Sequence, residues 1–287
     1  MIDLTDRVAL VTGAGQGLGR AHALALAGRG AAVVVNDVGR TEDGASTAEA
    51  VVDEIRWAGG RAISDRSDIS TADGAAALVA AAIAEFGRLD ILICNAGIVR
   101  DTSFVKMTQD QWDAVLSVHL GGTYQVIRAA WSGLRAQGYG RVVVTTSASG
   151  LYGSFGQANY SAAKTALLGL MNTLSIEGAK NDIRVNAISP VATTAMTEAL
   201  MTPQMREALD PGYVSPAVVY LASQECRLSS AILHVRGDEY AAVQLFQSKP
   251  VSFGRKPTPE EFESSLETLL DFTDSVPGAE AWANRVR

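Results

Sequence analysis

The stretch Thr12-Gly13-Ala14-Gly15-Gln16-Gly17-Leu18-Gly19 decides the fold. A short apolar run, Val8 to Val11, leads into it, and a helical stretch, Arg20 to Ala27, follows. A second strand-like run over 31–36 ends at Asp37. This order is typical of a dinucleotide-binding unit, in which glycines let the backbone approach a pyrophosphate at a helix N-terminus. Glycines can also serve only to make a tight turn, but the acid at Asp37 favours the nucleotide site.

The position of Asp37 indicates which dinucleotide would bind. It lies 18 residues after Gly19, close to the spacing of about 20 for a carboxylate that accepts ribose hydroxyls. A 2′-phosphate there would meet like charge, so NAD is preferred over NADP. Arg40 could accommodate a phosphate, although a solvated loop residue is the simpler interpretation, and Gln16 adds no cation to the turn.

The rest of the chain alternates between helical and strand-like runs. Helical patterns cover 45–58, 72–86, 109–136, 157–178, 196–208 and 217–222, and apolar strand-like runs cover 61–64, 89–94, 141–146, 184–188 and 232–235. Six or seven short strands alternating with helices predict an α/β fold, a doubly wound parallel sheet with helices on both faces. Ser215 is expected to cap the helix that begins at Pro216.

We expect residues 1–240 to form one catalytic domain in which the segment about 190–212 covers the site. Residues 241–287 are expected to form an extension packed on the same domain or on a partner subunit. Thr258-Pro259-Glu260-Glu261 predicts a capped helix that runs to about Phe272, and no periodicity is visible after Ser275.

Composition excludes several classes of function. The 287 residues are 47% hydrophobic, and the net charge of -7 leaves no basic footprint for nucleic acid. The longest apolar run, Gly74 to Ala84, is far shorter than the ~20 residues of a membrane span. The first strand begins too early to leave room for a signal peptide, and the two distant cysteines, Cys94 and Cys226, suggest reduced thiols. We therefore expect a cytoplasmic protein, and because the three histidines lack ligand spacing we expect no metal.

Two further strand ends carry candidate cofactor contacts. Asp68-Ile69 follows the third strand, where an acid and a backbone N–H could meet an adenine edge. The same residues could instead precede a helix that Ser70 or Thr71 caps, and the pattern does not separate the two alternatives. Asn95-Ala96-Gly97 closes the fourth strand with small residues that allow a close approach to a cofactor.

Tyr160 and Lys164 are the candidate catalytic pair. Four residues apart in a helical run, they share one helix face. A cation within about 4–6 Å can lower the pKa of a tyrosine by roughly 1–3 units, so that it can exchange a proton with an alcohol or a carbonyl. Ser147, at the end of the fifth strand and 13 residues before Tyr160, could hold the substrate oxygen beside the phenol.

Together these motifs resemble the short-chain dehydrogenase/reductase family over roughly Leu4 to Val235. The matching elements are Thr12-Gly13-x-x-x-Gly17-x-Gly19, Asn95-Ala96-Gly97, Ser147 and Tyr160-x-x-x-Lys164. The resemblance implies a single-domain Rossmann-type fold, usually a homodimer or homotetramer through the long helices 109–136 and 157–178. It also implies an NAD site formed by Gly13, Gln16, Gly17, Leu18, Gly19, Asp37, Asp68, Ile69, Asn95, Ala96, Gly97, Tyr160, Lys164, Pro190 and Thr194.

The chain looks closest to the (3R)-hydroxyacyl-CoA dehydrogenase branch of multifunctional enzymes and its bacterial stand-alone relatives. The runs 112–120, 128–131 and 147–160 carry this likeness. Where most of the family has a catalytic Asn, this chain has His119, as the branch does. His119 is therefore either a variant of the proton relay or a buried, hydrogen-bonded helix residue. Val191 replaces a usual Gly, Thr194 lies one residue early, and the last strand ends in Arg236-Gly237-Asp238.

The resemblance implies an NAD-dependent oxidoreductase that interconverts a secondary alcohol and a ketone. Ser147 would bind the substrate oxygen, Tyr160 would act as acid and base, and Lys164 would tune Tyr160 and bind the nicotinamide ribose. A 3-hydroxyacyl thioester is the expected substrate, and hydroxysteroids or other hydrophobic alcohols, or carbonyl reduction with NADP, are the alternatives. A non-catalytic dinucleotide sensor is a different class, although it would not need the catalytic residues.

The expected substrate contacts are weaker than the catalytic motifs. Lys249, Arg255 and Lys256 could meet the phosphates of coenzyme A, although a solvated basic loop explains them as well. Apolar side chains near Phe155 and two methionines, Met196 and Met201, suit any hydrophobic ligand.

Overall fold

A computed structural model describes residues 1–194 and 202–283. The chain divides into two compact units, Met1–Ala241 and Ala242–Arg287. Of the expected helix 196–208, the structure describes α8 (Pro203–Ala208), whereas 196–201, with Met196 and Met201, lies outside the described residues. None of the described helices combines the length and the apolar character that a bilayer span requires.

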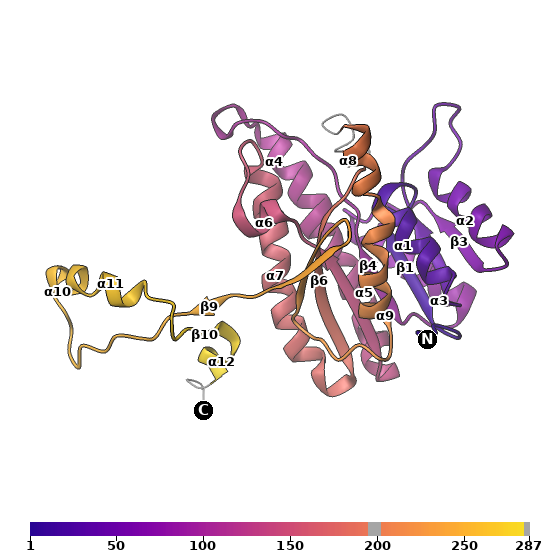
Figure 1. The fold of residues 1–287 in the computed structure, drawn as a ribbon. Coiled ribbons are helices and arrows are strands. Elements are labelled where there is room, and N and C mark those ends of the chain that lie inside the picture. The colour runs from indigo at the N-terminus through magenta and orange to yellow at the C-terminus, as the bar shows by residue number, and fades with distance from the viewer. Residues whose placement is uncertain (195–201, 284–287) are drawn as a thin grey trace. The chain divides into compact units, whose positions relative to one another are not determined.

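The first unit contains one eight-stranded sheet (Figure 1). Its strands are β1 (Val8–Thr12), β2 (Ala32–Asn36), β3 (Arg61–Asp65), β4 (Ile91–Cys94), β5 (Gly140–Thr145), β6 (Ile183–Val191), β7 (Ile232–Arg236) and β8 (Glu239–Val243), in the order β3-β2-β1-β4-β5-β6-β7-β8. All neighbours from β3 to β7 pair in parallel. The turn between β7 and β8 is only two residues long, so β8 runs back antiparallel. The predicted doubly wound sheet of about seven strands is confirmed, with β8 added at its edge.

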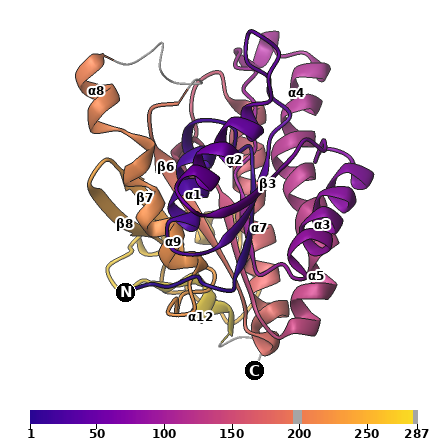
Figure 2. The same ribbon diagram turned by 90° about the vertical axis from the view of Figure 1, so that its right-hand side faces the viewer.

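Helices cover both faces of this sheet. They are α1 (Gly17–Ala27), α2 (Thr47–Trp57), α3 (Ala72–Phe86), α4 (Gln109–Leu116), α5 (Thr123–Gln137), α6 (Ala148–Tyr152), α7 (Ala158–Gly178) and α9 (Ser215–Ala222). The helices α1, α2 and α9 pack on one face, and α3, α5 and α7 pack on the other (Figure 2). Strand residues are buried on both sides, as in parallel sheets generally. The strand order reverses between β1 and β4, where such folds bind ligands beyond the carboxyl ends of the strands.

Two local predictions need correction, and one short helix was not expected. The expected single helix 109–136 contains a π-helical turn, Ser117–Gly122, between α4 and α5. The short helix α6 after Ser147 was not predicted. Ser215 is the first residue of α9 rather than its cap, and its hydroxyl lies 2.9 Å from Nδ1 of the buried His22.

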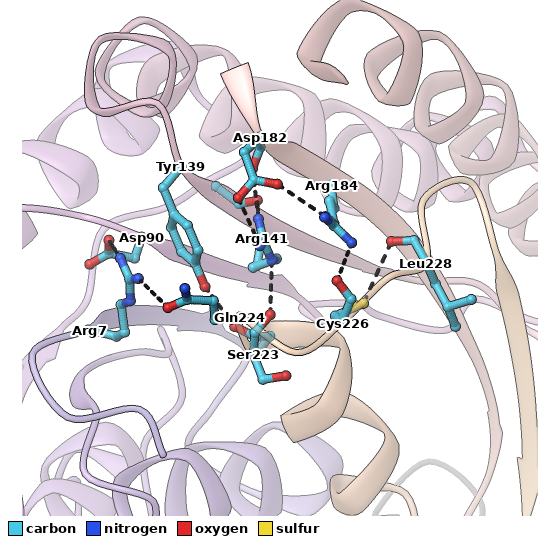
Figure 3. A network of polar contacts seen from close by, with 12 residues as sticks. Arg7, Asp90, Tyr139, Arg141, Asp182, Arg184, Ser223, Gln224, Cys226 and Leu228 are labelled. Carbon is cyan, nitrogen blue, oxygen red and sulfur yellow. Dashed lines mark hydrogen bonds and ion pairs between the residues drawn. The ribbon is translucent and has the colours of Figure 1, made fainter. Parts of the chain in front are cut away.

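A polar network ties the amino ends of the strands together, at the sheet edge opposite the ligand crevice (Figure 3). Asp90, whose side chain is fully buried, pairs with Arg7 at 3.1 Å and with Arg88 at 2.6 Å. Arg141 is buried and pairs with Asp182 at 3.1 Å. The ring of Tyr139 lies between the guanidinium groups of Arg7 and Arg141, whose carbons are 3.7 and 4.2 Å from its centroid. These contacts link segments that are far apart in the sequence.

The second unit is small and contains a two-stranded ribbon. Strand β9 (Phe246–Gln247) pairs antiparallel with β10 (Val276–Pro277), and α12 (Gly278–Ala283) follows, so the sequence after Ser275 is more ordered than its pattern indicated. The capping box between Thr258 and Glu261 is confirmed. The helix that it begins is interrupted at Ser265 and forms α10 (Pro259–Ser264) and α11 (Leu266–Leu269) instead of one helix to Phe272.

Candidate active site

Three glycines of the turn after β1 occupy positions where a side chain would clash or where the backbone is left-handed. Gly13 has a φ of 62°, and a Cβ there would lie 2.7 Å from the Cα of Ala96. A Cβ on Gly19 would lie 2.1 Å from the carbonyl oxygen of Gly13. Gly17 has a φ of 53° and begins α1. Glycine is therefore required at these positions by backbone conformation and by close approach.

The segment after β4 supports the glycine turn through hydrogen bonds. The Thr12 hydroxyl accepts hydrogen bonds from the backbone N–H groups of Asn95, at 3.0 Å, and Ala96, at 3.1 Å. The Asn95 side chain donates to the carbonyls of Thr12 and Gly13, both at 3.1 Å. Asn95-Ala96-Gly97 thus holds the turn in shape. Thr12 has a role here that the sequence analysis did not assign.

The N-terminus of α1 has the features of an anion site. Its N-cap, Gln16, makes no side-chain hydrogen bond to the first turn, and Leu18 lies within that turn. The first N–H groups of a helix have no partner within the helix, and the helix dipole places partial positive charge there. This cradle fits a dinucleotide pyrophosphate, which its N–H groups and glycines would hold.

Asp37 lies beside the glycine turn, as the adenosine end of a dinucleotide requires. Its carboxylate accepts hydrogen bonds from the N–H groups of Gly15, at 2.8 Å, and Gly39, at 2.7 Å. Each oxygen keeps a further lone pair with which it could accept from a ribose hydroxyl. Arg40 donates to the Gly44 carbonyl at 2.6 Å within its own exposed loop, which supports the loop interpretation of that arginine.

The contacts of Asp68 favour the alternative of a helix start. Its carboxylate accepts from the backbone N–H of Ser70, at 2.9 Å, and from the Ser70 hydroxyl, at 2.7 Å. Thr71 is the N-cap of α3. Ile69 is buried, and a Cβ on Gly122 would lie 2.8 Å from its Cδ1, so Ile69 packs against the helix that follows α4.

Ser147, Tyr160 and Lys164 converge beyond the end of β5. The Ser147 hydroxyl oxygen accepts from the Ser149 N–H at 3.2 Å and is also hydrogen-bonded to the Tyr160 phenol. Lys164 is buried, its ammonium donates to the Thr145 carbonyl at 2.6 Å, and its nitrogen lies 5.6 Å from the centroid of the Tyr160 ring. The Thr146 hydroxyl donates to the Lys164 carbonyl at 2.9 Å. The last residue of β5 and the residue that follows it therefore fix the lysine at its head group and at its backbone.

Burial has the largest effect on the pKa values of Tyr160 and Lys164. Burial raises the pKa of Tyr160 above its ordinary value, the hydrogen bond from Ser147 opposes this, and the charge of Asp101 adds to it. Burial also lowers the pKa of Lys164 to about 7. Desolvation is thus the largest influence on the pKa of both groups, and the expectation that Lys164 lowers the pKa of Tyr160 stays a prediction.

His119 lies beside Tyr160, in the π-helical turn. It is buried, and its Nε2 is 2.8 Å from the carbonyl oxygen and 3.0 Å from the amide nitrogen of Ile98. Its Nδ1 is buried without a protein partner. Burial, with the charge of Lys164, lowers the pKa of His119 to about 3, so the imidazole is neutral. This supports the expectation of a buried, hydrogen-bonded histidine and leaves one nitrogen unused.

Pro190 and Thr194 border the crevice on the side of β6. Pro190 is within β6, in register with Val235 of β7. A Cβ on Gly17 would lie 3.5 Å from the Thr194 Cγ2, so Thr194 faces the glycine turn. The N–H of Thr193 donates to the carbonyl of Leu209, the C-cap of α8, at 2.7 Å.

The structure also reveals residues that the motifs did not indicate. Asn159 is fully buried directly before Tyr160. Its amide nitrogen donates to the carbonyls of Arg100 and Gln111, and its oxygen accepts from the Tyr160 N–H at 2.8 Å. An amide inside a helical run, next to a candidate catalytic residue, was the only indication of this role in the sequence.

Comparisons with known proteins agree with this geometry. The family model described as short chain dehydrogenase matches residues 7–205. A short-chain type dehydrogenase/reductase of Mycobacterium tuberculosis is 47% identical over 277 residues, which cover 95% of this chain and 97% of that protein. The peroxisomal multifunctional enzyme type 2 of Mus musculus is 44% identical over 277 residues, which cover 94% of this chain but 37% of that enzyme.

A solved structure gives the same result. The crystal structure of a short chain dehydrogenase from Mycobacterium avium aligns with a TM-score of 0.84 at 40% identity and covers 93% of this chain and 95% of that one. The resemblance inferred from the motifs, including the likeness to peroxisomal multifunctional enzymes, is confirmed.

Proposed function

This chain belongs to the short-chain dehydrogenase family, and from this premise we propose that it is an NAD-dependent dehydrogenase of 3-hydroxyacyl thioesters. The observation that carries the proposal is the convergence of Ser147, Tyr160 and Lys164 beside the glycine cradle. The likeness to peroxisomal multifunctional enzymes supports the thioester as substrate.

Gly13, Gly17 and Gly19 would hold the pyrophosphate, Asp37 the adenine ribose, and Lys164 the nicotinamide ribose. When bound, the nicotinamide ring would accept a hydride from the alcohol carbon and add positive charge beside the phenol. The preference for NAD over NADP rests on Asp37, whose negative charge opposes a 2′-phosphate.

The chain's own residues would handle the proton. Ser147 would donate a hydrogen bond to the substrate oxygen, and the Tyr160 phenolate would remove the hydroxyl proton in oxidation or return it in reduction. Because burial raises the pKa of Tyr160, oxidation should accelerate as the pH rises above neutrality. Lys164, buried behind the ring, would pass a proton toward or from Tyr160 at little cost, since its pKa of about 7 is close to neutrality.

A turnover screen tests the proposal. Purified protein is mixed with NAD or NADP and with a 3-hydroxyacyl-CoA, a hydroxysteroid or a simple secondary alcohol, and reduced cofactor is followed by absorbance. We expect turnover of the thioester with NAD. Turnover of the steroid alone would show that the substrate is a hydroxysteroid rather than a thioester. Binding of NAD in calorimetry without turnover of any substrate would favour a dinucleotide sensor.

We further propose a homodimer or homotetramer through the long helical segments 109–136 and 157–178. Ile176 on α7 is 77% exposed and Tyr124 on α5 is 42% exposed, and apolar side chains on long helix faces favour association. Ile176→Asp should lower the mass measured by light scattering, whereas the neighbouring Glu177→Gln should not. The extension 241–287, which exposes Leu245, Phe262 and Leu270, would pack on its own first unit or on a partner subunit.

A further inference from the structure

A chain of short hydrogen bonds leads from the catalytic serine to an exposed acid. The Ser149 N–H donates to the Ser147 hydroxyl oxygen at 3.2 Å, and the Ser149 hydroxyl donates to Oε1 of Gln157 at 2.7 Å. The Gln157 Nε2 then donates to the carboxylate of Asp101 at 2.6 Å. Because a carboxylate only accepts hydrogen bonds, the Gln157 amide nitrogen must face Asp101, and this leaves Oε1 to accept from the Ser149 hydroxyl.

The loop that carries Asp101 is fastened to the loop that precedes α7. The Thr102 N–H donates to the Gly156 carbonyl at 2.9 Å. The neighbouring Arg100 directs its guanidinium to the Val99 carbonyl at 2.7 Å. Asp101 is exposed and is held by a neutral amide, so it presents a negative charge at the rim of the site.

This charge has a cost for the reaction. Asp101 contributes to the raised pKa of Tyr160, which lowers the fraction of Tyr160 that is phenolate near neutral pH and so slows alcohol oxidation there. The other groups that face Tyr160 are the buried Lys164, the neutral His119 and the Ser147 hydroxyl. A carboxylate that reduces the amount of Tyr160 phenolate but is held firmly in place needs another explanation.

We propose that Asp101 is a specificity-determining residue, whose carboxylate disfavours a second carboxylate next to the reacting alcohol and so selects neutral hydroxyacyl esters over free hydroxy acids. The inference rests on the proposed function and narrows its substrate class. In a free 3-hydroxy acid one methylene separates the carbinol carbon from the carboxylate. If the alcohol is bound to Ser147 and Tyr160, this carboxylate lies at the same rim of the site as Asp101. In a thioester the acyl group that replaces this carboxylate carries no charge. Like charges at this range, partly screened by solvent, change affinity by about three- to tenfold.

The test compares 3-hydroxybutyrate with its N-acetylcysteamine thioester, which has the same acid part and no net charge. Wild-type protein, Asp101→Asn and Asp101→Glu are assayed with NAD at low ionic strength, and Asp53→Asn, an exposed acid on α2, is the matched control. We expect Asp101→Asn to raise kcat/KM for the free acid by about three- to tenfold and to leave the thioester within about twofold. Asp101→Glu and the control should keep the wild-type ratio of kcat/KM between the thioester and the free acid.

Two further readouts separate an electrostatic role from a structural one. Asp101→Asn should shift the rising limb of the pH profile for thioester oxidation to lower pH, because it removes a charge that raises the pKa of Tyr160. In the wild-type protein, sodium chloride should reduce the difference in kcat/KM between the thioester and the free acid, because salt screens the repulsion. Turnover with an unchanged substrate ratio in Asp101→Asn overturns the role of Asp101 alone. If the wild-type protein turns over neither substrate, the proposed function fails and the specificity inference fails with it.

Discussion

The imidazole of His119 meets the phenol ring of Tyr160 edge to face, with the ring centroids 5.1 Å apart and the planes at 89°. The same imidazole is hydrogen-bonded to the backbone of Ile98, directly after Asn95-Ala96-Gly97. One neutral side chain therefore connects the helix that carries Tyr160 to the strand end that supports the glycine turn. His119 positions both halves of the site through contacts, with no charge of its own.

Gly97 should be indispensable because of His119. A Cβ at Gly97 would lie 2.1 Å from the Cε1 of His119, so Gly97→Ala should displace the ring and destabilise the fold by about 1–3 kcal/mol. The double variant Gly97→Ala with His119→Ala should recover part of that stability, as measured by urea unfolding in a double-mutant cycle. If the losses of unfolding free energy in the two single variants simply add in the double variant, the clash between residue 97 and His119 is not the cause.

Tyr160→Phe should abolish turnover and leave NAD binding intact. The ring and its packing remain, whereas the hydroxyl that exchanges the proton is lost. Turnover is measured by cofactor absorbance and NAD binding by calorimetry. A variant that keeps more than roughly a tenth of the wild-type rate would refute the role as base.

Stability should fall in acid because of His22. This residue is fully buried, and burial lowers its pKa to about 3, so the folded protein keeps it neutral while the unfolded chain takes up a proton below about 6.5. The stabilisation is complete above about pH 6.5 and decreases as the pH falls toward 3. Unfolding in urea at pH 7 and pH 5 should show a loss of roughly 1–3 kcal/mol.

His22→Gln tests the assignment, since glutamine does not titrate and can still bond to Ser215. Its loss of stability between the two pH values should be smaller than that of the wild-type protein. An equal loss would assign the pH dependence to other groups, His119 among them, whose pKa burial also lowers to about 3.

Asp90→Ala should destabilise the fold without impairing the chemistry. The buried carboxylate holds Arg7, Arg88 and the N–H of Val8, and its removal leaves two guanidinium groups unpaired. We expect a loss of roughly 2–4 kcal/mol, since both arginines can still reach water. Activity per folded molecule should persist, because the network lies at the amino ends of the strands (Figure 3). Glu54→Ala, which breaks the exposed pair with Arg20, should cost at most about 1 kcal/mol.

Much of the fold could be predicted because its determinants are local. The helix 72–86 and its end at Gly87, which has a φ of 77°, follow from periodicity and one glycine. The capping box at Thr258 likewise involves residues only three positions apart. The interruption at 117–122 could not be predicted in this way, because π-helical hydrogen bonds leave no mark in the apolar period.

By itself the sequence determined the order of strands and helices, the glycine turn, and the set of residues Ser147, Tyr160 and Lys164, since each depends on spacing along the chain. Only the tertiary structure decided that burial raises the pKa of Tyr160 and brings that of Lys164 to about 7. It alone brought Asp101 to the rim, through Gln157, 56 positions away, and His119 to Ile98. Desolvation and contacts between distant segments depend on how the whole chain packs, and no short window of sequence contains that information.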